Sequence, residues 1–174
     1  MEYSYRFRLY PTEAQEELMA KTFGCCRYVF NRFLDRRKTA YKETGTGLSY
    51  KECSKELTAL KKELPWLKEV DATALQASLK NLDRAYKNFF TGLKAGRRVG
   101  YPQFKAKKRD IPSFKATNNK GTVAIVGHSI RLPKIGYVDC RISKQVNGEI
   151  LSATVQQAKS GKYYVAINCK NVDL

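Results

Sequence analysis

Basic and aromatic residues alternate in the middle of the sequence, where residues 96–110 read GRRVGYPQFKAKKRD. Cations hold phosphate groups, and aromatic rings or guanidinium planes stack on bases. Between Lys94 and Lys120 the chain has nine cations and one acid, which supply nearly half of its net charge of +17. The residues predicted to bind RNA or phosphate are Arg84, Lys87, Arg97, Arg98, Tyr101, Phe104, Lys105, Lys107, Lys108 and Arg109. The rings, with Phe114, could equally anchor a loop onto the core, and the two roles can coexist.

A second set of polar residues recurs at helical spacing before this stretch. Residues three or four apart share one helix face, and five of them lie opposite an apolar stripe: Thr73, Gln76, Lys80, Arg84 and Lys87. A glutamine amide can bridge N6 and N7 of adenine, and cations can hold phosphates or guanine. Tyr50 and Ser54 form a pair four residues apart on an earlier predicted helix. Every soluble helix has a polar face, so the spacing leaves a solvated surface equally open.

No arrangement of nucleophiles, acids or metal ligands indicates catalysis. The single histidine, His128, lies between two predicted strands without a serine or cysteine arrangement that suggests a nucleophile. The carboxylates sit mainly beside lysines on predicted helix surfaces, and no pair on neighbouring strands suggests a two-metal site. The five cysteines lack the paired spacing of a zinc site or of a disulfide framework. We therefore expect no active site, no bound metal, and reduced thiols in the core.

The overall charge favours a polyanionic partner. The chain has 33 Lys and Arg against 16 Asp and Glu, with a pI near 9.8, and nucleic acid is the commonest polyanion. An anionic membrane would need an amphipathic anchor or a lipidation signal, and neither is apparent. The first ten residues lack the apolar run of a signal peptide. We expect a cytoplasmic, nucleoid-associated protein without membrane contact.

The first half of the chain predicts one strand and four helices. Residues 2–10 alternate between apolar and polar types, as in a half-buried strand. Gly24 is expected to interrupt the first helical segment, and a second helix then runs to about Lys42. Three polar residues have the position of an N-cap, the first with a capping-box glutamine three residues on: Thr12, Ser49 and Asp71. The fourth helix has an apolar stripe expected to face the core: Leu75, Leu79, Leu82, Tyr86, Phe89 and Leu93.

After Asp110 the hydrophobic period changes from 3.6 to 2, which predicts a series of short strands. Hairpin turns are expected at Asn147-Gly148 and within residues 159–162. The first strand has no local partner, so we expect it to pair with these distant strands. The pattern therefore predicts one β-domain built from both ends of the chain, with four helices inserted after its first strand.

Five quoted segments follow one another along nearly the whole chain: RLYPTEAQ, GCCRYVFNRFLDRRKTAYKETG, LPWLKEVDATALQASLKNLDRAYKNFF, GYPQFKAKK and LPKIGYV. In this order they resemble the TnpB (OrfB) proteins of insertion sequences, transposon-encoded RNA-guided DNA nucleases related to type V CRISPR effectors. The resemblance implies an α+β fold, in which a small antiparallel, wedge-like and OB-like β-barrel is interrupted by a four-helix recognition lobe. The expected domains are a barrel of residues 1–10 and 113–174, a helical lobe of residues 11–95, and a basic connector of residues 96–112.

The resemblance also implies a division of labour. The barrel and the connector would hold the scaffold of a guide RNA from the transposon end, while the helical lobe and the barrel read a short motif beside the double-stranded target DNA. The positions that match the family's motif-reading residues are Tyr50, Ser54, Gln76, Lys80 and Thr117. Thr73 joins them as a position at which the family varies, so the preferred motif stays open.

The chain departs from the family at its C-terminal end. The resemblance implies a RuvC-like nuclease that opens with GIDLG and carries three catalytic carboxylates and a zinc-binding cysteine cluster, whereas this sequence ends at CKNVDL. Asp173 is not the first of those carboxylates, because the glycines that would follow it are missing. We expect binding of guide RNA and target DNA without cleavage. Magnesium and zinc would belong to the nuclease part, and this chain would need no cofactor.

Two alternatives stay open. The first two predicted helices, around Gly24, could form a helix-turn-helix in a stand-alone DNA-binding regulator or transposase accessory protein. The apolar face of the second of these helices argues against that role. The chain could also work with a nuclease half supplied in trans.

Overall fold

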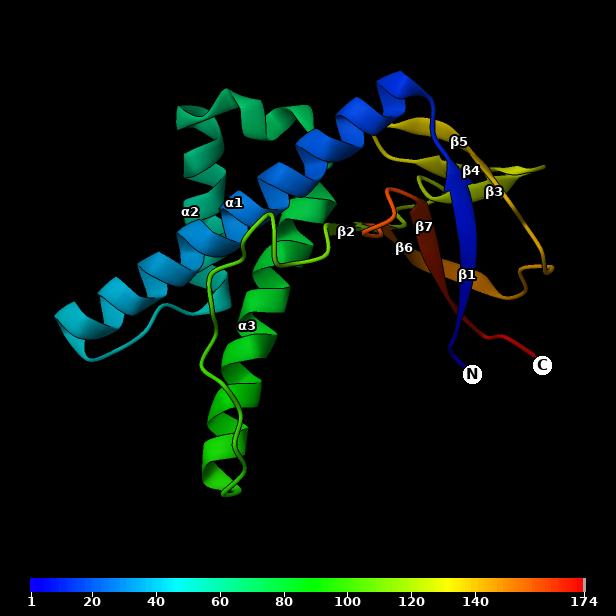
Figure 1. Ribbon diagram of the computed structural model, residues 1–174. Coiled ribbons are helices and arrows are strands. Elements are labelled where there is room, and N and C mark those ends of the chain that lie inside the picture. Colours follow the sequence, from blue (N-terminus) through cyan, green and yellow to red (C-terminus); the bar gives the residue numbers. More distant parts are fainter. Residues whose placement is uncertain (174) are drawn as a thin grey trace.

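The computed structural model describes residues 1–173, which form a helical part and an antiparallel sheet. Figure 1 shows the helices on one side of the molecule and most of the strands on the other. Residues 96–112, here called the connector, lead from the far end of α3 back to β2. The elements are β1 (Tyr3–Tyr10), α1 (Glu13–Thr44), α2 (Tyr50–Glu63), η1 (Pro65–Glu69), α3 (Ala72–Lys94), β2 (Ser113–Thr117), β3 (Ala124–Val126), β4 (Ser129–Leu132), β5 (Gly136–Cys140), β6 (Glu149–Gln157) and β7 (Tyr163–Lys170).

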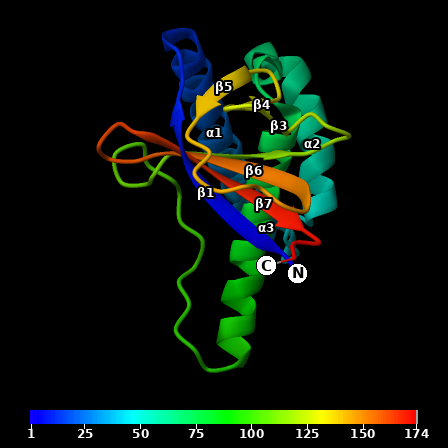
Figure 2. The same cartoon turned by 90° about the vertical axis from the view of Figure 1, so that its right-hand side faces the viewer.

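The sheet joins the two ends of the chain, as the sequence predicts. Its strand order is β2-β6-β7-β1-β5-β4-β3, and every pairing is antiparallel. In β1, Tyr5 lies opposite Ile167 of β7, and Leu9 lies opposite Cys140 of β5. Every second residue from Tyr5 to Leu9 is buried, which confirms the predicted half-buried strand. The two ends of the chain consequently lie side by side (Figure 2).

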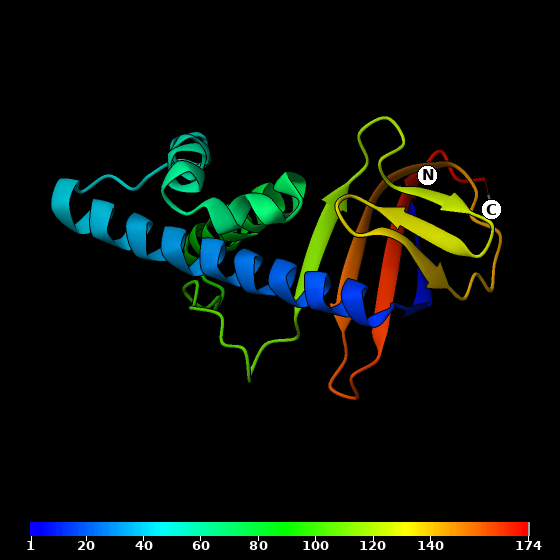
Figure 3. The same cartoon turned by 90° about the horizontal axis from the view of Figure 1, so that it is seen from above.

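The sheet is curved but open. Its edges are β2 and β3, and no ladder joins these two strands within residues 1–173. Figure 3 shows the curvature, with β2 as the strand nearest the helices. Closing a barrel requires edge strands that pair along their length, and β3 has only three residues. The closed barrel expected from the family resemblance is therefore not present in the described residues.

Only one of the two expected hairpin turns is confirmed. Residues 159–162 connect β6 to β7, and Ala158 N donates to Lys162 O at 2.8 Å. Asn147-Gly148 precedes β6, but β6 pairs with β2 and β7, whereas β5 pairs with β1 and β4. The prediction of a hairpin turn at Asn147-Gly148 is therefore wrong. Gly148 instead lets the backbone pass close to that of Lys170. Its φ is 84°, and a Cβ there would collide with the backbone oxygen of Lys170.

The helical part has three α helices and one 3-10 helix, so the expectation of four helices is wrong. Helix α1 continues through Gly24 without a turn. An interior glycine costs a helix only about 1 kcal/mol, and the burial of Phe23, Cys26 and Val29 around it offsets that cost. The helix-turn-helix considered as an alternative would need a turn at Gly24, and α1 has none there. All three predicted N-caps are confirmed, since each side chain accepts a backbone N–H: Thr12, Ser49 and Asp71.

One continuous hydrophobic cluster runs from the helices into the sheet. Phe23 of α1 and Phe114 of β2 meet there, with 5.4 Å between ring centroids. The apolar stripe of α3 is buried through Leu82 and Tyr86, but Leu93 is 58% exposed. The stripe therefore faces the core only along part of α3, whose far end extends beyond the other helices (Figure 1).

Candidate nucleic-acid interface

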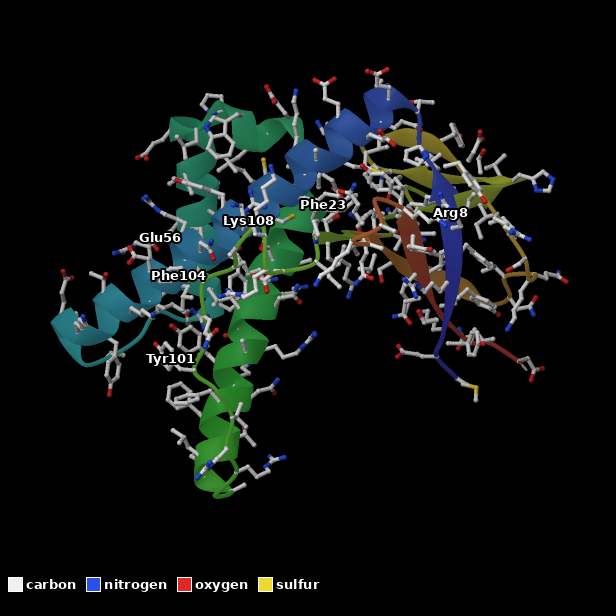
Figure 4. The ribbon with its side chains drawn as sticks, in the orientation of Figure 1. Arg8, Phe23, Glu56, Tyr101, Phe104 and Lys108 are labelled. Carbon is white, nitrogen blue, oxygen red and sulfur yellow. The ribbon has the colours of Figure 1, made fainter. Side chains whose placement is uncertain are left out.

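The connector is anchored to the helices by aromatic side chains. The hydroxyl of Tyr101 lies 3.0 Å from that of Tyr86, and its ring meets Phe89 edge-on at a centroid distance of 5.2 Å. Lys38 Nζ of α1 lies 5.4 Å from the ring centre of Tyr101 and 4.7 Å from that of Phe104. Figure 4 labels both rings on the connector where it passes the helices. The anchoring role is therefore present, and stacking of these rings on bases stays a prediction.

Asn31 of α1, which no sequence pattern indicated, fixes the next part of the connector. Its amide oxygen accepts from Lys105 N at 2.7 Å, and its amide nitrogen donates to Lys105 O at 2.9 Å. Both backbone groups of Lys105 are thereby satisfied, as they would be in a strand ladder. The Lys105 ammonium group lies 4.6 Å from the ring centre of Phe30. The side chain of Lys105 is therefore held against α1.

The connector then makes a turn that Asp110 closes. Asp110 Oδ2 accepts from Ala106 N at 2.7 Å and from Arg109 Nη2 at 3.3 Å. The hydrogen bond from Ala106, with the positive charge of Arg109 beside it, lowers the pKa of Asp110. Lys107 and Lys108 are exposed on this turn. Arg109 therefore supports the turn itself, whereas the two lysines are accessible to an anion.

Three of the predicted motif-reading side chains form a hydrogen-bonded set between α2 and α3. The hydroxyl of Tyr50 donates to Gln76 Oε1 at 3.0 Å, and Gln76 Nε2 donates to Ser54 Oγ at 3.1 Å. Ser54 Oγ also lies 3.4 Å from Gln76 Oε1. The two hydroxyls thus hold the amide of Gln76 in place between α2 and α3, and the amide has donor and acceptor capacity left for a ligand.

Thr73 and Thr117 join the helical part to the sheet at the same place. Thr117 N on β2 donates to Thr73 Oγ1 at 3.0 Å. Thr73, Gln76, Lys80 and Thr117 line one groove of about 300 Å³, here called the α3 groove. Tyr50 and Ser54 are both hydrogen-bonded to Gln76. The structure therefore brings together all six residues predicted to read a DNA motif. Their reading role stays a prediction.

A second cavity, here called the connector pocket, lies between α1, α3, the connector and β2. It has a volume of about 290 Å³, and its wall includes Phe23 and Phe114. Phe114 is buried, so it anchors the core and does not offer a face for stacking. Five cations line the pocket: Arg27, Arg84, Lys105, Lys107 and Lys115. Arg84 and Lys115 also line the α3 groove, so the two cavities adjoin along α3.

Five of the cations predicted to bind RNA or phosphate lie outside these cavities, and two of them, Lys108 and Arg109, lie on the connector turn. Lys87 Nζ is 3.1 Å from Asp83 Oδ2, one turn earlier on α3. Arg97 and Arg98 follow the far end of α3, away from the sheet (Figure 1). Sequence reasoning grouped them with the others because it counts charge along the chain. It missed Arg27 and Lys115, because neither stands in a distinctive local pattern.

The buried thiols are not activated. All five cysteines are free and buried, and burial raises the pKa of Cys26 to about 12 and that of Cys140 to about 11. Such thiols stay protonated at neutral pH and are poor nucleophiles. Within residues 1–173, no three His, Cys, Asp or Glu side chains gather closely enough to hold a metal ion. The described residues therefore do not fit the magnesium and zinc that the resemblance implies for a nuclease part.

None of the helices in the described part of the chain is long and apolar enough to cross a membrane.

Known proteins match this chain along nearly its whole length. InsQ of Escherichia coli (strain K12), named as an RNA-guided DNA endonuclease, is 35% identical over 171 residues, covering 97% of this chain and 40% of InsQ. A Streptomyces pristinaespiralis protein, also named as an RNA-guided DNA endonuclease, is 31% identical over 173 residues, covering 97% of this chain and 41% of that protein. The virulence protein VsdF of Salmonella dublin is 35% identical over 108 residues, covering 57% of this chain and 88% of VsdF.

A family described as a helix-turn-helix domain, that of the IS605-type OrfB proteins, matches residues 1–46. The chain belongs to the TnpB (OrfB) family. This TnpB-family chain spans about two fifths of the length of the two endonuclease relatives. Its residues 1–46 contain β1 and α1, and α1 is one uninterrupted helix despite the name of the matching domain.

Proposed function

We propose that this chain is the nucleic-acid-binding part of a TnpB-like RNA-guided DNA endonuclease. In this proposal it holds the scaffold of a guide RNA and reads a short motif in double-stranded target DNA, and it does not cleave DNA by itself. The observation that carries the proposal is the basic trough formed by the α3 groove and the connector pocket together. Seven cations and one carboxylate, Asp110, line the trough: Arg27, Lys61, Lys80, Arg84, Lys105, Lys107 and Lys115.

Base reading is assigned to the α3 groove. Tyr50 and Ser54 orient the amide of Gln76, which keeps a second N–H and a further lone pair for a ligand. A glutamine amide pairs with both N6 and N7 of adenine in the major groove. Lys80, one turn along α3, would hold a neighbouring guanine or phosphate. Thr73 and Thr117 close the groove where the helices meet the sheet.

RNA binding is assigned to the connector and the sheet. The connector presents Lys107 and Lys108 on a turn whose shape depends on Asp110. Such cations follow a phosphate backbone without reading its sequence. Base pairing between guide and target would supply the sequence specificity. Magnesium, zinc and the nuclease carboxylates would belong to another part of the protein or to a partner in trans.

A stand-alone helix-turn-helix regulator is not favoured. That function would require a turn inside residues 13–44, with a second helix free to enter the major groove. Helix α1 has no such turn, and its central residues Phe30, Phe33 and Leu34 are buried in the core.

The test is to express the chain with its native flanking DNA, purify it at high salt and sequence the nucleic acid that remains bound. High salt removes nonspecific phosphate contacts. We expect one discrete transcript from the end of the transposable element. The matched variants are Lys107→Gln with Lys108→Gln, expected to lose the transcript, and Lys159→Gln with Lys162→Gln on the β6–β7 turn, expected to keep it. Random RNA, or equal retention by both variants, would contradict the RNA-binding role.

A further inference from the structure

We propose that the connector pocket binds a single phosphate group of the DNA strand whose bases occupy the α3 groove, an inference that rests on the function proposed above. The pocket carries an excess of positive charge, with five cations and one carboxylate in its lining. Its five cations make no ion pair within residues 1–173, and its one carboxylate, Asp110, already accepts from Ala106 and Arg109. Unpaired cations that share a small cavity repel one another, and a bound anion relieves that repulsion.

The walls of the pocket strengthen this attraction. Phe23 and Phe114 supply buried apolar surface, and the buried hydroxyl of Ser78 donates to Cys26 O at 2.7 Å. Charges attract more strongly beside such walls than in open water. Asn31 holds the backbone of Lys105, and the ammonium group of Lys105 already lies 4.6 Å from the ring centre of Phe30. Less side-chain freedom is therefore lost when an anion binds.

The shared residues place the phosphate on the DNA. Arg84 and Lys115 line the α3 groove and the connector pocket alike. A strand that places bases in the groove must carry its phosphates past these two side chains. Phosphate contacts of this kind fix the register of a protein on a duplex, while base contacts specify the sequence. The pocket would therefore set which base step faces Gln76.

The test measures the affinity of the full chain for a short fluorescent DNA duplex across a range of salt concentrations. The pocket variant is Arg27→Gln with Lys115→Gln. The control, Lys159→Gln with Lys162→Gln, removes the same charge from exposed residues of the β6–β7 turn. We expect the pocket variant to lose about tenfold in affinity and to reduce the slope of log K against log salt by about 1, as the loss of one phosphate contact does. The control is expected to change affinity less than about threefold, because its charges lie far from the strand.

Equal effects of the two variants would overturn the phosphate site while leaving DNA binding intact. Failure of the unmodified chain to bind any duplex would overturn both the site and the proposed function. A duplex of the same sequence in RNA is measured in parallel, and a larger loss with RNA than with DNA would overturn the assignment to the DNA strand. Thermal unfolding of each variant, expected to be unchanged, separates lost contacts from lost structure.

Discussion

At the scale of single residues, Gln76 is the side chain on which the proposed motif reading most depends. Replacing it with alanine removes the amide, whereas Tyr50→Phe keeps the amide and removes one of the two hydrogen bonds to its oxygen. One bidentate amide–adenine contact is worth about 1–3 kcal/mol of discrimination. We therefore expect Gln76→Ala to lower the preference for selected over scrambled duplexes by about tenfold, and Tyr50→Phe to lower it by less.

The preference is measured by selecting bound duplexes from a library with randomised sequence beside the target. Thr58→Ala is the control, because it removes an exposed hydroxyl on α2 outside the groove. A motif preference that survives in Gln76→Ala would contradict the assigned reading role.

Arg37 and Asp83 form the most buried ion pair among the described residues. Arg37 Nη2 lies 2.9 Å from Asp83 Oδ1, with side-chain exposures of 8% and 21%, and Lys87 binds the other oxygen from the exposed side. Asp83→Asn would leave the buried guanidinium without its counter-charge. We expect the free energy of unfolding to fall by about 2 kcal/mol, below the usual cost of breaking a fully buried pair. Lys87→Gln should change it by less than about 0.5 kcal/mol, because that lysine is exposed.

The contribution of this ion pair is tested by measuring the free energy of unfolding with denaturant at several pH values. Burial alone would raise the pKa of Asp83, but the hydrogen bonds from Arg37 and Lys87 outweigh it and lower the pKa below its ordinary 3.8. A lowered folded-state pKa stabilises the protein above the unfolded-state value, and this contribution is lost as the pH falls through the folded-state value. The unmodified chain and Asp83→Asn should therefore converge below pH 3.8. A constant difference down to strong acid would contradict the pair's role.

At the scale of elements, the continuity of α1 can be tested at Gly24, with Gly92 of α3 as a contrasting packed glycine. Gly24 is inside the helix with open space, since a Cβ there would find only Arg27 Nη2, 4.0 Å away. Gly24→Ala should raise the free energy of unfolding by about 0.5–1 kcal/mol. Gly92 in α3 is packed against Val99 of the connector, and a Cβ would collide with that side chain. Gly92→Ala should lower the free energy by about 1–3 kcal/mol.

Both predictions are checked by measuring the free energy of unfolding of the two variants by chemical denaturation. Destabilisation by Gly24→Ala would indicate a turn at that position and would restore the helix-turn-helix arrangement of residues 1–46.

The attachment of the connector gives a second prediction at this scale. Asn31→Ala removes both hydrogen bonds to the backbone of Lys105. We expect the free energy of unfolding to fall by only about 1 kcal/mol, because the core is untouched. The two hydrogen bonds between Asn31 and Lys105 are here called the clamp. Amide exchange near Lys105 should nevertheless speed up by at least about tenfold, because local opening of the connector no longer has to break the clamp. Asn118→Ala, which removes a side-chain bond to Ile150 O between the sheet strands, should leave exchange in the connector unchanged.

Local patterns in the sequence predict the caps, the turn at residues 159–162 and the alternation in β1, because each depends on neighbouring residues. Gly24 was misjudged because burial of its neighbours outweighs its weak propensity. The clamp between Asn31 and Lys105 joins residues 74 positions apart, and no local pattern contains it. Five of the six residues predicted to read a DNA motif were named from the family resemblance, and helical spacing alone had left their role undecided.

At the scale of the whole molecule, the shared core gives the basic trough a rigid frame. Helices and sheet belong to one hydrophobic cluster, and β2 lies where they meet. The trough therefore needs little reorganisation before a nucleic acid binds. With a net charge of +17, the chain attracts any polyanion from all sides. Nucleic acid must therefore bind at the trough in particular, and it must protect the trough more than it protects other basic surfaces.

Acetylation of lysines, read by mass spectrometry with and without a bound DNA duplex, tests that claim most directly. All the lysines compared are exposed in the structure. We predict at least about tenfold slower acetylation of the trough lysines, and less than about twofold change at the others, because protection requires direct contact. The trough lysines compared are Lys80, Lys105 and Lys115, and the others are Lys51, Lys55, Lys159 and Lys162. Equal protection of the two sets, or stronger protection of the second, would contradict the assignment of the nucleic-acid interface to the trough.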